Sequence, residues 1–261
     1  MPAYYNEFDP YAAQWLRNLI AAGHIAPGDV DERSITDVRP DDLRGYEQCH
    51  FFAGIGGWSL ALRVAGWPDA RPVWTGSCPC QPFSAAGKQR GSDDERHLWP
   101  TFFDLIRERR PASVFGEQVA GAAGLAWLDH VCADLEGAGY AAAAADLCAA
   151  GVGAPHIRQR LYWVAHADGR DARTEGLQRS GQHGQQPQDG GACLVAWRDL
   201  EWIECSDGKA RPTEPGLFPL AHGIPNRVGR LRAYGNAIVP QVAAVFVMAN
   251  AELSGGCKPS A

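Results

Sequence analysis

Apolar residues along the first two-thirds of the chain follow two alternating spacings. Intervals of three and four residues predict amphipathic helices at residues 11–22, 58–65, 98–109 and 125–139. Short apolar runs predict strands at residues 4–10, 30–38, 49–53, 72–74, 111–115, 140–144 and 160–165. Strands that alternate with helices favour an α/β fold with a Rossmann-like, mostly parallel sheet and helices on both faces.

The pattern changes at residue 168. Residues 169–191 are rich in Gln, Gly, Arg and Asp and have almost no apolar periodicity, which is typical of a flexible loop or small insert. An apolar helix that could dock on the sheet is predicted at residues 241–252. We therefore expect one domain from residues 1–167 and 233–252, a small irregular insert at 168–232, and a disordered tail at 253–261.

The octapeptide at residues 77–84, Ser-Cys-Pro-Cys-Gln-Pro-Phe-Ser, places a thiol after a predicted strand. Open α/β sheets carry their chemistry at the carboxyl ends of strands, so Cys80 is a candidate nucleophile. A single Cys-x-Cys is too tight and too solitary for the usual zinc spacings. A buried structural thiol fits these eight residues equally well.

Two further strand ends carry candidate functional residues. Residues 52–57, Phe-Ala-Gly-Ile-Gly-Gly, form a glycine-rich turn between a predicted strand and a predicted helix. Such a turn lets backbone N–H groups approach a nucleotide-type cofactor, although a plain tight connection gives the same pattern. Glu117 follows the strand predicted at 111–115, in a position equivalent to that of Cys80. The alternative for Glu117 is a helix-capping or exposed acid.

Composition limits the classes of partner. The formal net charge of −6 means that a nucleic-acid partner needs a local basic patch, such as residues 158–160 or 227–232. A solvated charged face would contain the same clusters. No apolar run approaches the ~20 residues of a membrane span, and the amino terminus lacks the pattern of a secretion signal. Eight irregularly spaced cysteines indicate reduced thiols, so we expect a cytoplasmic protein.

Five segments resemble the motifs of the DNA cytosine-C5 methyltransferases, in that family's order. Residues 52–57 resemble its AdoMet loop, and residues 79–84 resemble its nucleophile motif. Residues 117–119 are similar to its Glu-Asn-Val motif, with Gln in place of Asn. Residues 156–160 are similar to its Gln-x-Arg-x-Arg motif, with His in place of Gln, and residues 235–240 to its closing motif.

The resemblance implies a class I AdoMet-dependent methyltransferase that modifies C5 of a flipped-out cytosine in duplex DNA through a covalent bond between Cys80 and C6. The implied catalytic residues are Cys80, Glu117, Arg158 and Arg160. The implied cofactor residues are Phe52, Ala53, Gly54, Ile55, Gly56, Gly57, Asn236 and Ala237. The implied substrate contacts are Pro79, Gln81, Ser84 and Gln118, with Arg211 and Arg230 from residues 168–232 as a target-recognition region.

The chain departs from the family in one respect. Between the glycine-rich turn and the nucleophile motif it has room for one helix and one strand, whereas the family places two further strands there. Residues 6–13 resemble the family's missing second motif, and residues 30–43 resemble the third. We interpret the chain as permuted, with Glu7 at the AdoMet ribose beside Phe8, and Asp31 at the adenine. Alternatively, Glu7 is merely a surface acid near the amino terminus.

Two other functions stay open at this point. Some relatives methylate tRNA, so RNA is an alternative substrate, and a catalytically degenerate DNA-binding relative is a third hypothesis. The expected partner is double-stranded DNA, with no membrane and no metal, and the expected state is a monomer in a bacterial or phage-infected cytoplasm. Residues 85–97 are long enough to act as a lid over the flipped base.

Overall fold

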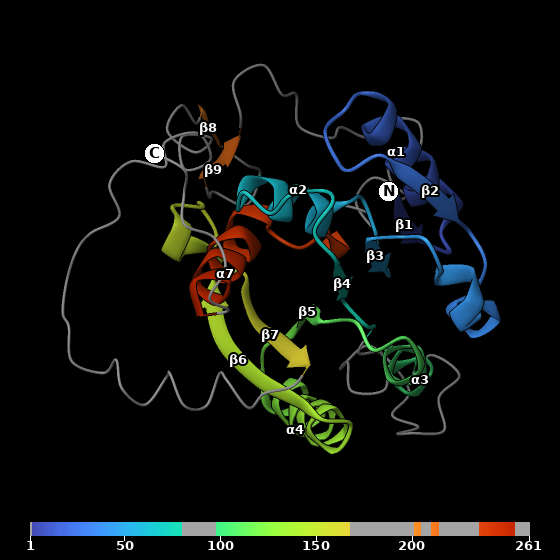
Figure 1. Cartoon of the computed structure of the whole chain (residues 1–261). Coiled ribbons are helices and arrows are strands. Elements are labelled where there is room, and N and C mark those ends of the chain that lie inside the picture. The colour runs from blue at the N-terminus through green and yellow to red at the C-terminus, as the bar shows by residue number, and fades with distance from the viewer. Residues whose placement is uncertain (1, 80–97, 168–200, 205–209, 214–234, 254–261) are drawn as a thin grey trace, which may run out of the picture.

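The fold is organised around a seven-stranded sheet. The computed structural model describes residues 2–79, 98–167, 201–204, 210–213 and 235–253 of the chain. The strands of the main sheet are β1 (Ala3–Asn6), β2 (Gly28–Asp31), β3 (Gln48–Phe51), β4 (Val73–Gly76), β5 (Ser113–Val119), β6 (Tyr140–Cys148) and β7 (Gln159–Ala167). A separate two-stranded sheet consists of β8 (Glu201–Glu204) and β9 (Ala210–Thr213), as Figure 1 shows.

The strand order of the main sheet is β2-β1-β3-β4-β5-β7-β6. Neighbours from β2 to β5 are parallel, whereas β7 runs antiparallel to both β5 and β6. The prediction of a mostly parallel α/β sheet is therefore confirmed. The first two strands of the chain form one edge, beside β3, which leads into the glycine-rich turn.

Helices cover both faces of this sheet, as predicted (Figure 1). They are α1 (Pro10–Ala21), α2 (Gly57–Val64), α3 (Trp99–Arg109), α4 (Ala122–Gly137) and α7 (Pro240–Leu253), with short 3-10 turns η1 (Ile35–Asp37), η2 (Pro40–Leu43) and η4 (Ala149–Val152). Apolar side chains of α3, α4, η1 and η2 pack together on one face. Those of α2 and α7 form a second core on the other face, next to a smaller core under α1. No helix in the described ranges is long and apolar enough to cross a membrane.

The helix α1 begins where the sequence supplies a cap. The Asp9 carboxylate accepts hydrogen bonds from the backbone N–H groups of Tyr11, at 2.9 Å, and Ala12, at 3.3 Å. Such a cap contributes about 1 kcal/mol to helix stability. The buried side chains of Ala13 and Leu16 then attach the helix to the sheet. Asp9 is therefore a structural residue that fixes the turn after β1.

Two predicted strands have different limits in the structure. The strand predicted at 30–38 is wrong in extent, because β2 spans Gly28–Asp31 and the chain then turns into η1. The Ser34 hydroxyl caps that turn by accepting a hydrogen bond from Thr36 N at 3.3 Å. The strand predicted at 111–115 continues to Val119, because β7 pairs with β5 as far as Val119 and Arg160. Glu117 consequently lies within β5 and not after it.

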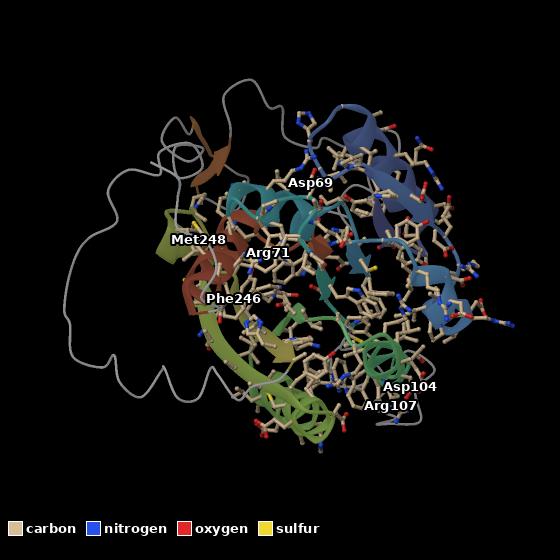
Figure 2. All side chains as sticks on the ribbon, viewed as in Figure 1. Asp69, Arg71, Asp104, Arg107, Phe246 and Met248 are labelled. Carbon is tan, nitrogen blue, oxygen red and sulfur yellow. The ribbon has the colours of Figure 1, made fainter. Side chains whose placement is uncertain are left out.

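The carboxyl-terminal helix α7 docks on the sheet, as its apolar pattern predicted. Phe246 packs against the rings of Phe115 and Tyr162, with centroids 6.2 and 5.8 Å away. Met248, two residues further along α7, is 41% exposed (Figure 2). The packing of α7 against α2 brings the segment that precedes α7 close to the glycine-rich turn.

Candidate active site

The carboxyl ends of β1 and β3 bring two distant segments together. Asn6 pairs with Phe51 in the parallel register, so Glu7 and the glycine-rich turn start side by side. Two hydrogen bonds join the turn to the end of β1, from Ala53 N to Asn6 O at 3.0 Å and from Gly54 N to the Glu7 Oε2 atom at 2.7 Å. The Glu7 carboxylate therefore lies directly against the predicted cofactor loop, although 47 residues separate it from Gly54.

The backbone of this turn requires glycine at Gly56. Its φ angle is +83°, and an added Cβ would lie 3.1 Å from the Ile25 Cδ1 atom. Gly56 is also the N-cap of α2, so the first backbone N–H groups of that helix point out of the turn. A helix N-terminus that follows a glycine turn favours a negatively charged ligand group. Phe52 and Ile55 in the same turn are half-buried.

The side chains of two other predicted cofactor residues near this edge differ: one is exposed, and the other is hydrogen-bonded within the protein. The Phe8 ring is 71% exposed and presents an apolar face directly after β1. The Asp31 carboxylate instead accepts hydrogen bonds from Tyr4 at 2.7 Å and from Arg33 at 2.7 Å. Burial acts to raise the pKa of Asp31, but these hydrogen bonds outweigh it and lower the pKa. A contact of Asp31 with adenine stays a prediction.

A buried ion pair lies on β5 and β7. The Arg160 Nε atom is 2.8 Å from the Glu117 Oε1 atom, and Glu117 is 8% exposed. Burial raises the pKa of the Glu117 carboxyl, while the positive charges of Arg160 and Arg158 and a hydrogen bond from Ser77 act in the opposite direction. A carboxyl group whose pKa is raised by burial keeps its proton to a higher pH than an exposed glutamate does, which suits general acid–base chemistry.

Arg158 connects β7 to the segment before α7. Its guanidinium donates hydrogen bonds to the carbonyl oxygens of Gly235, at 3.0 Å, and Ala237. Burial, followed by the charge of Arg160, lowers the pKa of Arg158. The same segment touches the glycine-rich turn, since a Cβ on Gly57 would lie 2.7 Å from the Ile238 Cγ1 atom. Among the predicted cofactor residues in this segment, Asn236 is exposed and Ala237 is half-buried.

The segment that leads to Cys80 is fixed from β5. The Gln118 side chain is 2% exposed and donates from its Nε2 atom to the Cys78 carbonyl oxygen at 3.2 Å. Its Oε1 atom accepts from Val119 N at 2.8 Å, so both ends of the amide are used within the protein. Gln118 thus holds the backbone next to Pro79, and a direct substrate contact by either residue stays a prediction.

Several predicted site residues lie outside the described residues: Cys80, Gln81, Ser84 and Arg230, together with the predicted lid at 85–97. Arg211 belongs to β9, where only the course of the backbone is described. Within the described part of the chain, no group of three or more His, Cys, Asp or Glu side chains could hold a metal ion.

Sequence reasoning missed two polar contacts in the site. The Trp58 Nε1 atom donates a hydrogen bond to the Ser77 hydroxyl at 3.0 Å, and Ser77 in turn contacts Glu117. Asn6 was also missed, although its Nδ2 atom donates to the Arg33 carbonyl at 2.9 Å and holds the loop after β2. Nothing in the local pattern marks these residues, because each partner is distant in sequence.

Comparison with known proteins gives consistent matches. Residues 68–190 match the family model described as C-5 cytosine-specific DNA methylase. The Type II methyltransferase M.AplI of Arthrospira platensis is 30% identical over 151 residues, which cover 44% of this chain and 44% of that protein. The Type II methyltransferase M.AgeI of Thalassovita gelatinovora is 35% identical over 106 residues, which cover 40% of this chain and 25% of that protein. The chain thus spans less than half the length of these relatives.

Among solved structures, a mutant of Spodoptera frugiperda DNMT2 aligns with a TM-score of 0.46 and 17% identity, covering 72% of this chain and 48% of that one.

Proposed function

We propose that the chain is a DNA cytosine-C5 methyltransferase that transfers a methyl group from AdoMet to C5 of cytosine in duplex DNA, which its match to that family's model over residues 68–190 supports. The observation that carries this proposal is the buried pair of Glu117 and Arg160, beside the segment that enters the nucleophile motif. It supports the proposal because it supplies, beside the segment that leads to Cys80 in the sequence, a carboxyl group able to exchange a proton with the ring and a cation able to bind the ring's oxygen.

The described residues fit AdoMet at the carboxyl ends of β1 and β3. The N-terminus of α2 suits the carboxylate of the methionine moiety, and Glu7 lies where it could accept hydrogen bonds from the ribose hydroxyls. The exposed ring of Phe8 could stack on the adenine. When bound, AdoMet supplies an electrophilic methyl group.

The chain's own residues would prepare the cytosine. Cytosine C5 is a weak nucleophile until a thiolate adds to C6, and we assign that addition to Cys80. Glu117 in its protonated form donates to N3 and relieves the negative charge that enters the ring. Arg160 binds the O2 oxygen, and Arg158 holds the segment before α7 in place. Once C5 carries the methyl group, a solvent water takes the C5 proton, the C5–C6 double bond re-forms, and the C6–S bond breaks to release Cys80 as the thiolate.

This chemistry requires the base to leave the duplex. Swinging a base out of the stack costs a few kcal/mol, and a closing lid would offset part of that cost. We assign the lid to residues 85–97 and sequence recognition to residues 168–232, with Arg211 and Arg230 as candidate contacts to phosphates or guanines. A region this small suits a short recognition site. We assign the reaction to a bacterial or phage-infected cytoplasm, which the similarity to bacterial Type II methyltransferases supports.

The order of the strands supports a permuted arrangement of the family's motifs. The first two strands of the chain occupy the edge beside β3, where the displaced cofactor-side strands are needed. The chain has only to return from β2 past β1 to reach β3, and adjacent strands lie roughly 5 Å apart. The contact between Glu7 and Gly54 is the specific consequence of this arrangement.

Methyl transfer to different nucleic acids tests the proposed function. Labelled AdoMet is offered with plasmid duplex DNA and with bulk tRNA, and the modified base is identified by mass spectrometry. The proposal predicts 5-methylcytosine in DNA and none in tRNA. Label in tRNA alone would favour the RNA alternative, and binding to DNA without transfer to either substrate would favour a degenerate relative.

Replacing Glu7 tests the cofactor site. We expect Glu7→Ala to weaken AdoMet binding roughly 10- to 100-fold, because it removes hydrogen bonds to a charged acceptor. Isothermal titration calorimetry measures this affinity without any turnover. The matched control is Glu32→Gln, an exposed acid near the end of β2 whose carboxylate pairs with Arg17 at 2.7 Å. An unchanged affinity of Glu7→Ala for AdoMet would contradict the permuted arrangement.

A further inference from the structure

A chain of hydrogen bonds crosses from the cofactor side of the site to Glu117. It starts at Trp58, in the first turn of α2, whose side chain is 5% exposed between Phe115 and Tyr162. The Trp58 Nε1 atom donates to the Ser77 Oγ atom at 3.0 Å. Ser77 directly follows β4 and lies beside Glu117, because Gly76 and Gly116 pair in the parallel register of β4 and β5, and its hydroxyl acts on the Glu117 carboxyl as a hydrogen-bond partner. Three separate segments of the sequence thus meet at one serine.

The direction of these hydrogen bonds follows from the chemistry of the groups. An indole N–H can only donate, so Ser77 must accept from Trp58. A hydroxyl has a single proton, which Ser77 can therefore direct to the carboxylate of Glu117. The indole fixes the serine, and the serine supplies a donor of fixed direction to Glu117.

We propose that Ser77 is a positioning residue for Glu117, and that Trp58 acts through it by orienting the serine hydroxyl. This inference rests on the proposed function, because it names what sets the geometry of the proposed proton donor. Arg160 binds Glu117 from β7, and Ser77 binds it from the segment after β4. Two donors from different segments hold a planar carboxyl group more firmly than one donor can.

Ser77 also affects the protonation of Glu117. The groups that face Glu117 are Ser77, after β4, and Arg158, Arg160 and Tyr162, on or next to β7. Burial raises the pKa of Glu117, and the Ser77 donor opposes this by stabilising the ionised form. Removal of that donor therefore raises the pKa further. Since the protonated form is the proposed donor, the fall in rate at alkaline pH should then occur at higher pH.

The experiment compares methyl-transfer rates across pH for the full chain and three variants. Ser77→Ala is expected to lower the maximal rate roughly tenfold, because the Glu117 carboxyl loses its fixed orientation. It should also move the alkaline limb of the pH–rate profile, where the rate falls as pH rises, to higher pH. Ser77→Thr keeps the hydroxyl and should return both quantities towards the wild-type values. Trp58→Phe keeps an aromatic ring in the core but removes the indole donor, so it should shift the limb in the same direction by a smaller amount.

A second readout does not depend on turnover. The ionisation of Glu117 is followed by infrared spectroscopy of its carboxyl group, as the difference between each protein and the same protein carrying Glu117→Gln. Titration at higher pH in Ser77→Ala than in wild type supports the inference even if no substrate is methylated, in which case only the proposed function fails. An alkaline limb and an infrared titration that both stay unmoved in Ser77→Ala and in Trp58→Phe would overturn it.

Discussion

Replacing Glu117 by Gln is expected to lower the rate of methyl transfer by roughly 100- to 10,000-fold, the contribution of a positioned general acid or base. Glutamine has nearly the same shape and can still accept from Arg160, so the site keeps its geometry. The amide cannot transfer a proton to N3, however, so the negative charge that enters the ring is not neutralised there. Single-turnover assays with labelled AdoMet measure this rate without interference from product release.

The control for this variant separates chemistry from folding. Glu117→Gln exchanges a buried acid for a neutral amide, so the free energy of unfolding should stay within about 1 kcal/mol of wild type. Glu136→Gln, an exposed acid on α4, should change neither rate nor stability. A rate for Glu117→Gln within threefold of wild type would remove Glu117 from the mechanism.

Replacing Arg160 by Met should abolish transfer and also destabilise the fold. The Glu117 carboxyl would remain buried without the Nε donor that now lies 2.8 Å from it. Leaving a buried charged group without its partner costs about 2 kcal/mol where some water still reaches it, as it does around this partly exposed arginine. Chemical denaturation at pH 8 measures the loss of unfolding free energy.

The sign of the pH dependence gives this prediction a second test. Without Arg160 the pKa of Glu117 lies further above its value in the unfolded chain. The cost is therefore smallest at low pH, where the carboxyl is protonated in both states. It grows as pH rises from the pKa of Glu117 in the wild type to its higher pKa in the variant, and is constant above that. Adding Glu117→Gln to Arg160→Met should restore most of the lost stability, because the buried charge is gone.

An exposed ion pair provides the matched control. Arg107 and Asp104 on α3 lie 2.9 Å apart, with side chains 57% and 61% exposed (Figure 2). Arg107→Met should change the unfolding free energy by less than about 0.5 kcal/mol. Equal losses of unfolding free energy in Arg107→Met and Arg160→Met would show that the Glu117–Arg160 pair stabilises the fold no more than an exposed ion pair does.

The elements that sequence reasoning predicted well are those specified by local patterns. Helix α1 follows from its apolar spacing, and the turn after β3 follows from its glycines. Two strands before the glycine-rich turn were also predicted, because the family has two further strands between that turn and the nucleophile motif and this chain has no room for them there. In the structure these strands, β1 and β2, form the edge beside β3. These inferences require only neighbouring residues or the order of segments.

The features that were missed depend on contacts between distant segments. The extension of β5 to Val119 requires β7 as its antiparallel partner, which no local pattern in β5 reveals. The hydrogen bonds of Arg158 to the segment before α7 join residues 77 and 79 positions apart. Ser77 and Trp58 are 19 residues apart and meet only because α2 packs over the end of β4. Such pairs become visible only when the strands are placed.

The central claim is that the Cys80 thiolate bonds to C6 of cytosine, and a fluorinated duplex tests it most directly. Fluorine at C5 cannot leave as a proton, so the adduct cannot break down after methylation. The wild-type chain, incubated with AdoMet and a duplex carrying 5-fluorocytosine, should yield a species with the mass of protein, DNA strand and one methyl group, linked at Cys80. Cys80→Ser should yield none. Methyl transfer to ordinary cytosine by Cys80→Ser at the wild-type rate would contradict the account.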